Sequence, residues 1–391
     1  MRVFAFFVLV CGVAAQQLPP TIAPATVTPS SITPPSIEET LAAANAKYVH
    51  HDYPASLDLY EQASQAIEQT APENPQRYEV LKRLAAVSGA QGRYQAAIGY
   101  LQSAIQWRWD QISRDDPTVL IDRVLQVNLY RAMENFAQAR VVLLSVMSKH
   151  QGLSGFRTIA MAEDYSLMGQ IYMDEKNFSD AAEQLETAAA IRGAISGQLD
   201  VSLVPDLDRL GAVYLALHTY DKAEPIFRRA LVIRESVLGS ENADLLATLD
   251  GLAYSYFGQD KFDEAEPVYQ RLIHLWSKSV GETHPMLALA LDKVGIFYAA
   301  QKKNDQAREA FERANAIRAN SLAAGLSTEA GHAREAGDLA AAAALYARAV
   351  RVLDPPNPIY DGTRTQAALN LKSIDDAMGP KPGTKKAVTK K

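Results

Sequence analysis

The stretch YDKAEPIFRRALVI, from Tyr220 to Ile233, recurs 42 residues later as FDEAEPVYQRLIHL, from Phe262 to Leu275. In both copies the apolar and alanine positions follow each other at intervals of three and four residues, which places them on one face of a helix. The register extends over eight copies, at steps of 41 or 42 residues and a last step of 35. Their equivalent small residues are Ser56, Ala97, Ala139, Ala181, Ala223, Ala265, Ala307 and Ala342.

A second anchor precedes the first in each copy. Leu210-Gly211 with Tyr214 matches Met168-Gly169 with Tyr172, and a turn-like stretch separates the two anchors. Each copy is therefore predicted to be helix–turn–helix, and the glycines are expected where a helix meets its partner closely. Since two helices cannot bury their shared apolar faces alone, successive pairs must stack on one another.

This pattern of Leu-Gly, Tyr three residues later, and then Ala, a bulky residue and Ala resembles the tetratricopeptide repeat. The 42-residue unit, with its AEP motif and the VGETHP linker at 280–285, resembles the repeats of kinesin light chain and bacterial relatives. The resemblance implies an all-α solenoid, a right-handed superhelix of about eight repeats over 37–353. It also implies a concave groove lined by the first helices, which holds a peptide or another protein.

The N-terminus MRVFAFFVLVCGVAA is typical of a signal peptide, with an apolar run followed by small residues at 14–15. We expect cleavage after Ala15, which would leave no Cys in the mature chain because Cys11 is the only one. The following Pro-, Thr- and Ser-rich segment, residues 16–36, is expected to be an unfolded linker. The predicted localisation is therefore exported, periplasmic or secreted, in a bacterial setting.

The C-terminal extension, residues 354–391, ends in a tail with five lysines after Gly379. We expect this tail to be disordered, and its alternative role is a weak contact with an anionic surface. The whole chain has a net charge of −6 and a pI near 5.7, which argues against nucleic acid as partner of the folded part. Its mean hydropathy of −0.13 excludes a polytopic membrane protein, and the mature chain is expected to have no transmembrane segment.

Three first helices repeat an aspartate within LDRLG, LDGLA and LDKVG, at Asp208, Asp250 and Asp292. By the family resemblance this position faces the groove, so a negative stripe there would select a basic or amide-donating peptide. The alternative is that each Asp is merely solvated or paired with Arg209 or Lys293. Tyr254 and Phe257, on the same helix as Asp250, are candidates for an aromatic platform in the groove, although aromatics at helical spacing also occur in cores.

No arrangement of residues typical of an enzyme is present. The seven His form no HExxH pair, and there is no GxGxxG or phosphate-binding loop. We therefore predict no catalytic residues, no metal site and no cofactor. The predicted function is an exported, non-enzymatic scaffold or adaptor that binds an unidentified protein or peptide, and the aspartate stripe favours a basic one. The alternative is a structural component of an envelope assembly, built by self-association of solenoids and anchored by the tail.

Overall fold

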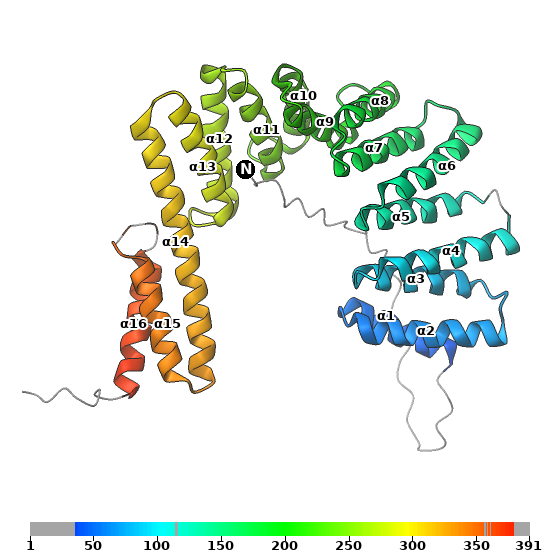
Figure 1. Ribbon diagram of the computed structural model, residues 1–391, viewed down its shortest axis with the longest axis horizontal. Helices are drawn as coiled ribbons and strands as arrows, with labels where there is room; N and C mark the ends of the chain where they lie inside the picture. The colour runs from blue at the N-terminus through cyan, green and yellow to red at the C-terminus, as the bar shows by residue number, and fades with distance from the viewer. Residues whose placement is uncertain (1–35, 114–115, 356, 358, 360, 379–391) are drawn as a thin grey trace, which may run out of the picture. The chain divides into compact units, whose positions relative to one another are not determined.

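The computed structural model describes residues 36–113, 116–355, 357, 359 and 361–378, and all regular structure in these residues is helical (Figure 1). The all-α fold expected from the sequence is thus confirmed. The helices are α1 (Ile37–Val49), α2 (Tyr53–Thr70), α3 (Gln76–Ala90), α4 (Tyr94–Gln111), α5 (Thr118–Ala132), α6 (Phe136–Ser154), α7 (Ile159–Asp174), α8 (Phe178–Ser196), α9 (Val204–Ala216), α10 (Tyr220–Leu238), α11 (Leu246–Phe257), α12 (Phe262–Val280), α13 (Pro285–Ala300), α14 (Asn304–Glu335), α15 (Leu339–Val352) and α16 (Asp361–Met378). Two short 3-10 helices, η1 (Val201–Leu203) and η2 (Ala243–Leu245), precede α9 and α11.

The chain divides into two compact units, residues 1–74 and 75–391. The first unit contains the helix pair α1 and α2. Ser56 on α2 donates a hydrogen bond to the carbonyl of Ala44 at 2.9 Å, and the Tyr60 hydroxyl donates to Asn45 at 2.6 Å. These two hydrogen bonds join α1 to α2, and their donors Ser56 and Tyr60 occupy the small and the bulky position of the repeat pattern.

In the second unit, each helix packs mainly on the helices next to it in the chain, as a solenoid of helix pairs requires (Figure 1). An extensive buried cluster runs from α8 to α14, a second lies on α5–α7, and a third joins α13 and α14. Ala223 and Ala265, which the pattern identifies as packing positions, are fully buried there. The helical-repeat architecture predicted from the 42-residue spacing is therefore confirmed.

Each pair is closed by a one-residue turn in the left-handed region. Across the described chain these turn residues have φ between 57° and 84°, and they are His51, Gly92, Glu134, Lys176, His218, Asp260, Lys302 and Gly337. The residue after each turn donates its N–H back to the first helix, at 2.8–3.0 Å, as from Lys261 to the Tyr256 carbonyl. This bond satisfies a carbonyl at the helix end and reverses the chain, so the turn repeats with the same register as the sequence.

The glycines in the first helices make room for large side chains. An added Cβ on Gly211 would lie 2.6 Å from the Phe227 ring, and one on Gly251 would lie closer still to the same ring. Gly295 stands in the same relation to Phe311, at 2.6 Å. The close approach predicted at Gly211 is confirmed, and at both Gly211 and Gly295 an aromatic ring of the second helix makes this approach.

The last two copies share one helix. α14 is 32 residues long and serves as the second helix of the seventh copy and the first helix of the eighth. Its second half packs with α15 and α16 around Leu326, Tyr346 and Ile374, which are all buried. The packed helical structure therefore continues to Met378, past the boundary expected at 353.

No helix in the described ranges is long and apolar enough to span a membrane. The signal peptide, nearly all of the Pro-rich linker and the Lys-rich tail expected from the sequence lie outside the described residues.

Candidate functional site

Three consecutive first helices, α9, α11 and α13, carry the same pattern of side chains on one face. On each helix an apolar residue is followed by an Asp three residues later and by a second apolar residue four residues after the Asp. This spacing places the three residues on the same face of their helix. We call these nine residues the first-helix array. They are Pro205, Asp208 and Ala212, then Ala247, Asp250 and Tyr254, then Leu289, Asp292 and Ile296.

The apolar members of the array are all exposed. The three largest are 40% exposed at Tyr254, 49% at Leu289 and 54% at Ile296. Isolated exposed apolar residues are ordinary on a protein surface, but here they recur at the same positions of three successive first helices. The array therefore has the property expected of a contact surface.

Asp208 is held by its neighbours. Its carboxylate lies 2.7 Å from Arg234 of α10 and accepts a hydrogen bond from the Thr248 hydroxyl of α11 at 3.0 Å. Burial raises the pKa of the Asp208 carboxyl above its ordinary value, although Arg234 and Thr248 act in the opposite direction. Arg209, which the sequence offered as a partner, binds Asp206 instead, because adjacent residues on a helix diverge.

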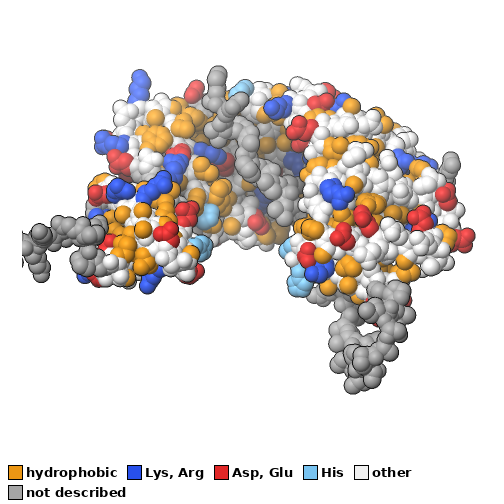
Figure 2. All heavy atoms as spheres, turned by 60° about the horizontal axis from the view of Figure 1, so that its bottom comes forward, with side chains coloured by type: hydrophobic (Ala, Val, Ile, Leu, Met, Phe, Trp, Pro, Cys, Tyr) orange, Lys and Arg blue, Asp and Glu red, His pale blue; other side chains and the backbone are white. Residues whose placement is uncertain are grey.

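Asp250 and Asp292 are also ion-paired. The Asp250 carboxylate lies 2.5 Å from the Lys293 ammonium of α13, as one of the sequence-based alternatives proposed. Asp292 pairs with Arg318 of α14. Since each carboxylate has a cation of this chain beside it, the array has no uncompensated row of negative charge. On the face drawn in Figure 2, acidic and basic side chains are likewise interspersed among apolar ones.

The two aromatic candidates have different environments. Tyr254 is exposed and packs edge-on against Tyr220, with their ring centroids 5.9 Å apart. Phe257 is partly buried and contacts Phe262 and Phe297 at centroid distances of 6.3 and 6.0 Å. Tyr254 therefore belongs to the surface, whereas Phe257 is a member of the core.

A second set of aspartates was not identified from the sequence. Asp122, Asp164 and Asp206 are buried and recur 42 residues apart on α5, α7 and α9, so the repeat spacing itself was the signal. Their contacts include Tyr78 for Asp122 at 2.6 Å and His150 for Asp164, also at 2.6 Å. These carboxylates join neighbouring helices inside the stack and do not face the array.

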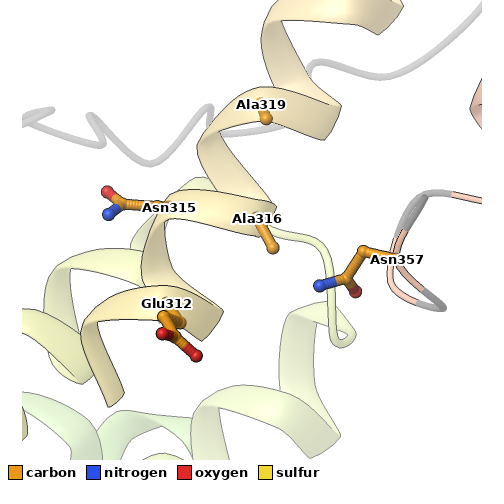
Figure 3. A pocket seen from close by; sticks show the side chains of 5 residues that line it. All are labelled: Glu312, Asn315, Ala316, Ala319 and Asn357. Carbon is orange, nitrogen blue, oxygen red and sulfur yellow. The ribbon is translucent and has the colours of Figure 1, made fainter. Parts of the chain in front are cut away.

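A pocket of about 320 Å³ lies elsewhere, between α14 and the connection that follows α15. It is lined by Glu312, Asn315, Ala316, Ala319 and Asn357. Figure 3 shows Asn357 facing Ala316, while Asn315 points away from the loop. The pocket contains one carboxylate and no cluster of groups that could act together chemically. Within the described residues, no three His, Cys, Asp or Glu side chains are grouped so that they could hold a metal ion.

Comparison with known proteins gives a family match in the middle of the chain. The tetratricopeptide repeat family matches residues 203–273 and 244–320, which include the whole array. No curated protein matches the chain.

Several solved structures are similar in fold. BtubC (BKLC) from P. vanneervenii is 18% identical over 61% of this chain and 91% of its own, with a TM-score of 0.49. A kinesin light chain protein from Podosopora anserina with nearly identical TPR-like repeats is 20% identical over 52% of this chain and 97% of its own, with a TM-score of 0.48. The C-terminal part of a TPR repeat-containing protein from Cytophaga hutchinsonii is 14% identical over 71% of this chain and 95% of its own, with a TM-score of 0.49.

The family match over 203–320 falls on the part of the chain where the 42-residue unit repeats most regularly. The structure extends the same helix–turn–helix unit and the same left-handed turn in both directions from that segment. Residues 203–320 therefore match the tetratricopeptide repeat family, and this family suggests a scaffold for protein–protein interaction.

Proposed function

We propose that the chain is an exported, non-catalytic scaffold that binds an extended segment of another protein on the first-helix array. The observation that carries this proposal is the exposure of Tyr254, Leu289 and Ile296 at equivalent positions of α11 and α13. Full burial of one such side chain stabilises a complex by about 1.5–3 kcal/mol before the costs of association are subtracted.

The spacing of the array suits an extended partner. The two apolar positions of each helix are seven residues apart, which is about 10 Å along the helix axis. An extended chain advances about 3.3 Å per residue, so every third residue of a partner segment would match the spacing of the two apolar positions on one helix.

The partner would contact the array mainly through apolar side chains. Asp250 and Asp292 already have a cation beside them, which reduces their attraction for a strongly basic peptide. Their carboxylates remain partly exposed and can accept hydrogen bonds from amide or basic groups of the partner. We therefore propose a partner segment that is largely apolar and carries hydrogen-bond donors between its apolar residues.

Export is supported by the N-terminal sequence, in which an apolar run from Val3 to Val13 precedes small residues. Sequencing the N-terminus of the protein recovered from its native cell would test this part. A mature chain that begins at Gln16 supports export, and an intact Met1 in the accumulated protein contradicts it.

Binding is tested with a peptide selected from a random library against the full chain. Replacing Tyr254, Leu289 and Ile296 together by Ser should weaken its binding at least tenfold in fluorescence anisotropy. The matched control replaces Val141 and Val232, equally exposed residues of the second helices α6 and α10, by Ser. Equal binding by the array variant and the wild type would contradict the proposal.

Self-association is the alternative use of this surface. Sedimentation of the full chain at rising concentration distinguishes it, because a dimer that the array variant abolishes would assign the array to an interface between copies. A monomer at all concentrations, together with loss of peptide binding in the array variant, supports the scaffold.

A further inference from the structure

Four connections between copies begin in the same way. After α6, α8, α10 and α12 the chain continues with a glycine whose φ lies between 77° and 101°, and these are Gly155, Gly197, Gly239 and Gly281. Because the glycines are 42 residues apart, the residues after them can be compared position by position. The residues that directly follow the glycines are, in chain order, Phe156, Gln198, Ser240 and Glu282. Among these four connections, the one after α6 is therefore the only one with an apolar residue at this position.

The other three connections are each bound by an arginine of the next second helix. The three contacts are Arg229 with the Gln198 carbonyl at 2.8 Å, Arg271 with the Ser240 carbonyl at 2.6 Å, and Arg313 with the Glu282 carboxylate. The equivalent residue on α8 is Thr187, whose hydroxyl donates to the Glu183 carbonyl of its own helix at 2.9 Å. The connection after α6 therefore has no arginine at the position that holds the other three.

Phe156 belongs to a group of exposed apolar residues. Its side chain is 57% exposed, and Leu153 on the last turn of α6 is 61% exposed. Ile159, the first residue of α7, is 36% exposed. We call these three residues, together with Arg157, the α6–α7 tip. Since water contact of large apolar side chains is unfavourable, such a group within seven residues is typical of a contact with another surface.

The charge around the α6–α7 tip is basic. From residue 135 to residue 162, which includes the whole of α6 and the tip, the sequence contains no Asp or Glu, although the chain has 45 of them. Arg157 in the tip and Lys149 on α6 are both exposed. The other connections between copies, from α2 to α13, each contain an acidic residue, and examples are Glu73, Asp116, Asp200, Glu241 and Glu282. Exposed apolar residues and basic charge without acidic charge therefore coincide at this connection.

We propose that the α6–α7 tip is a membrane-docking site, which inserts Leu153 and Phe156 into the interface of a bilayer that contains anionic phospholipids. Arg157 would bind the lipid phosphates while the apolar side chains lie between the headgroups and the acyl chains. The complementary charge favours an anionic lipid surface. A bilayer can also receive exposed side chains of a short connection without a pocket of matching shape. The tip shares no residue with the first-helix array, so this inference is independent of the partner binding proposed above.

Site-specific fluorescence quenching of the full chain tests the proposal. Phe156→Trp places a fluorophore in the α6–α7 tip, and Leu144→Trp places one at an equally exposed position of α6, which is 56% exposed. The probe is a vesicle of phosphatidylcholine and phosphatidylglycerol with brominated acyl chains. It should quench the Phe156→Trp protein more than the wild type, whereas the Leu144→Trp protein should behave as the wild type. Equal quenching of the two variants would overturn the proposal.

Co-sedimentation with the same vesicles measures the contribution of the apolar residues. Phe156→Gln with Thr187→Arg introduces the two residues that bind each other after α8, so the connection stays held while its apolar side chain is removed. These changes together with Leu153→Ser should weaken binding about tenfold. The matched control is Val141→Ser with Leu144→Ser, because these α6 residues are 60% and 56% exposed. Unchanged binding of the tip variant would contradict the proposal.

The basic charge of the tip predicts lipid selectivity. Arg157→Gln should weaken binding to vesicles with phosphatidylglycerol about fivefold, and it should leave binding to pure phosphatidylcholine unchanged. An equal loss on both kinds of vesicle would contradict the anionic assignment. Sedimentation without vesicles provides a further test, because a dimer that the tip variant abolishes would assign the tip to a contact between copies and overturn the proposal.

Discussion

The Lys261 ammonium lies 2.6 Å from the Glu224 carboxylate, so the turn of the sixth copy is bound to the second helix of the fifth. Glu224 is the Glu of the AEP motif, and the equivalent Glu266 binds Lys303 of the next turn at 2.9 Å. In the AEP motif the Ala is therefore buried between helices, and the Glu binds the Lys in the turn of the following copy.

Replacing Glu224 by Gln should destabilise the protein by about 1–2 kcal/mol. The Glu224 side chain is buried, and it would lose the charge-assisted bonds from Lys261 and Arg228. Thermal and chemical denaturation measure the change. Asp305→Asn is the matched control, since its pair with Arg308 is exposed, and it should change stability by less than about 0.5 kcal/mol.

The pair of Glu266 with Lys303 should be lost in acid. The hydrogen bond from Lys303 holds the pKa of the Glu266 carboxyl below its ordinary value of 4.5. A carboxyl whose pKa is lower in the folded protein than in the unfolded one stabilises the fold at pH values above its pKa in the unfolded protein. This stabilisation disappears as the pH falls through its pKa in the folded protein. Glu266→Gln should therefore lose less stability than the wild type between about pH 5 and 3, as measured by denaturation midpoints. Parallel pH profiles of the two proteins would contradict this prediction.

Gly211→Ala should destabilise the protein by about 1–3 kcal/mol, because the new methyl group would meet the Phe227 ring. Gly99→Ala on α4 is the matched control. Nothing lies within 4 Å of the Cβ it would gain, so the change should raise stability by up to about 1 kcal/mol through helix propensity. Denaturation midpoints that move in the same direction for both variants would be inconsistent with the packing described.

Lys302→Gly should stabilise the turn between α13 and α14 by up to about 1 kcal/mol. Lys302 has a φ of 61°, which a side chain disfavours and Gly adopts freely. The reverse change, Gly337→Ala, is made at the equivalent turn, where φ is 84°, and should cost about 1 kcal/mol. Differential scanning fluorimetry of the two variants should give shifts of opposite sign.

The register of the fold could be predicted from the sequence because each anchor, such as Ala223 or Ala265, repeats at a fixed spacing. The shared helix α14 was not predicted. The last step of 35 residues is seven shorter than the usual step of 42, and seven residues make about two helical turns. The missing seven residues remove the linker between the seventh and eighth copies, and a loss of two whole turns keeps the apolar positions of both copies on the same face. The second helix of the seventh copy and the first helix of the eighth therefore form one continuous helix, α14.

The recurrence of Asp208, Asp250 and Asp292 was visible in the sequence, but most of their partners were not. Arg234 and Arg318 each lie 26 residues after the Asp they bind, on a different helix. Which cation reaches which carboxylate depends on side-chain conformation and on the packing of helices. The different exposure of Tyr254 and Phe257 could not be predicted for the same reason, since both residues are aromatic and lie on the same helix.

The shared helix α14, about 48 Å long by its 32 residues, also limits how this gene can change. Internal copies can be duplicated or deleted as 42-residue blocks with the register of the repeat kept. The final copy cannot be deleted in this way, because the deletion would begin within α14 and would expose the buried side chains of Ala323, Leu326 and Ala330. Growth or shortening of the array by whole-copy recombination should therefore be confined to the copies before the seventh.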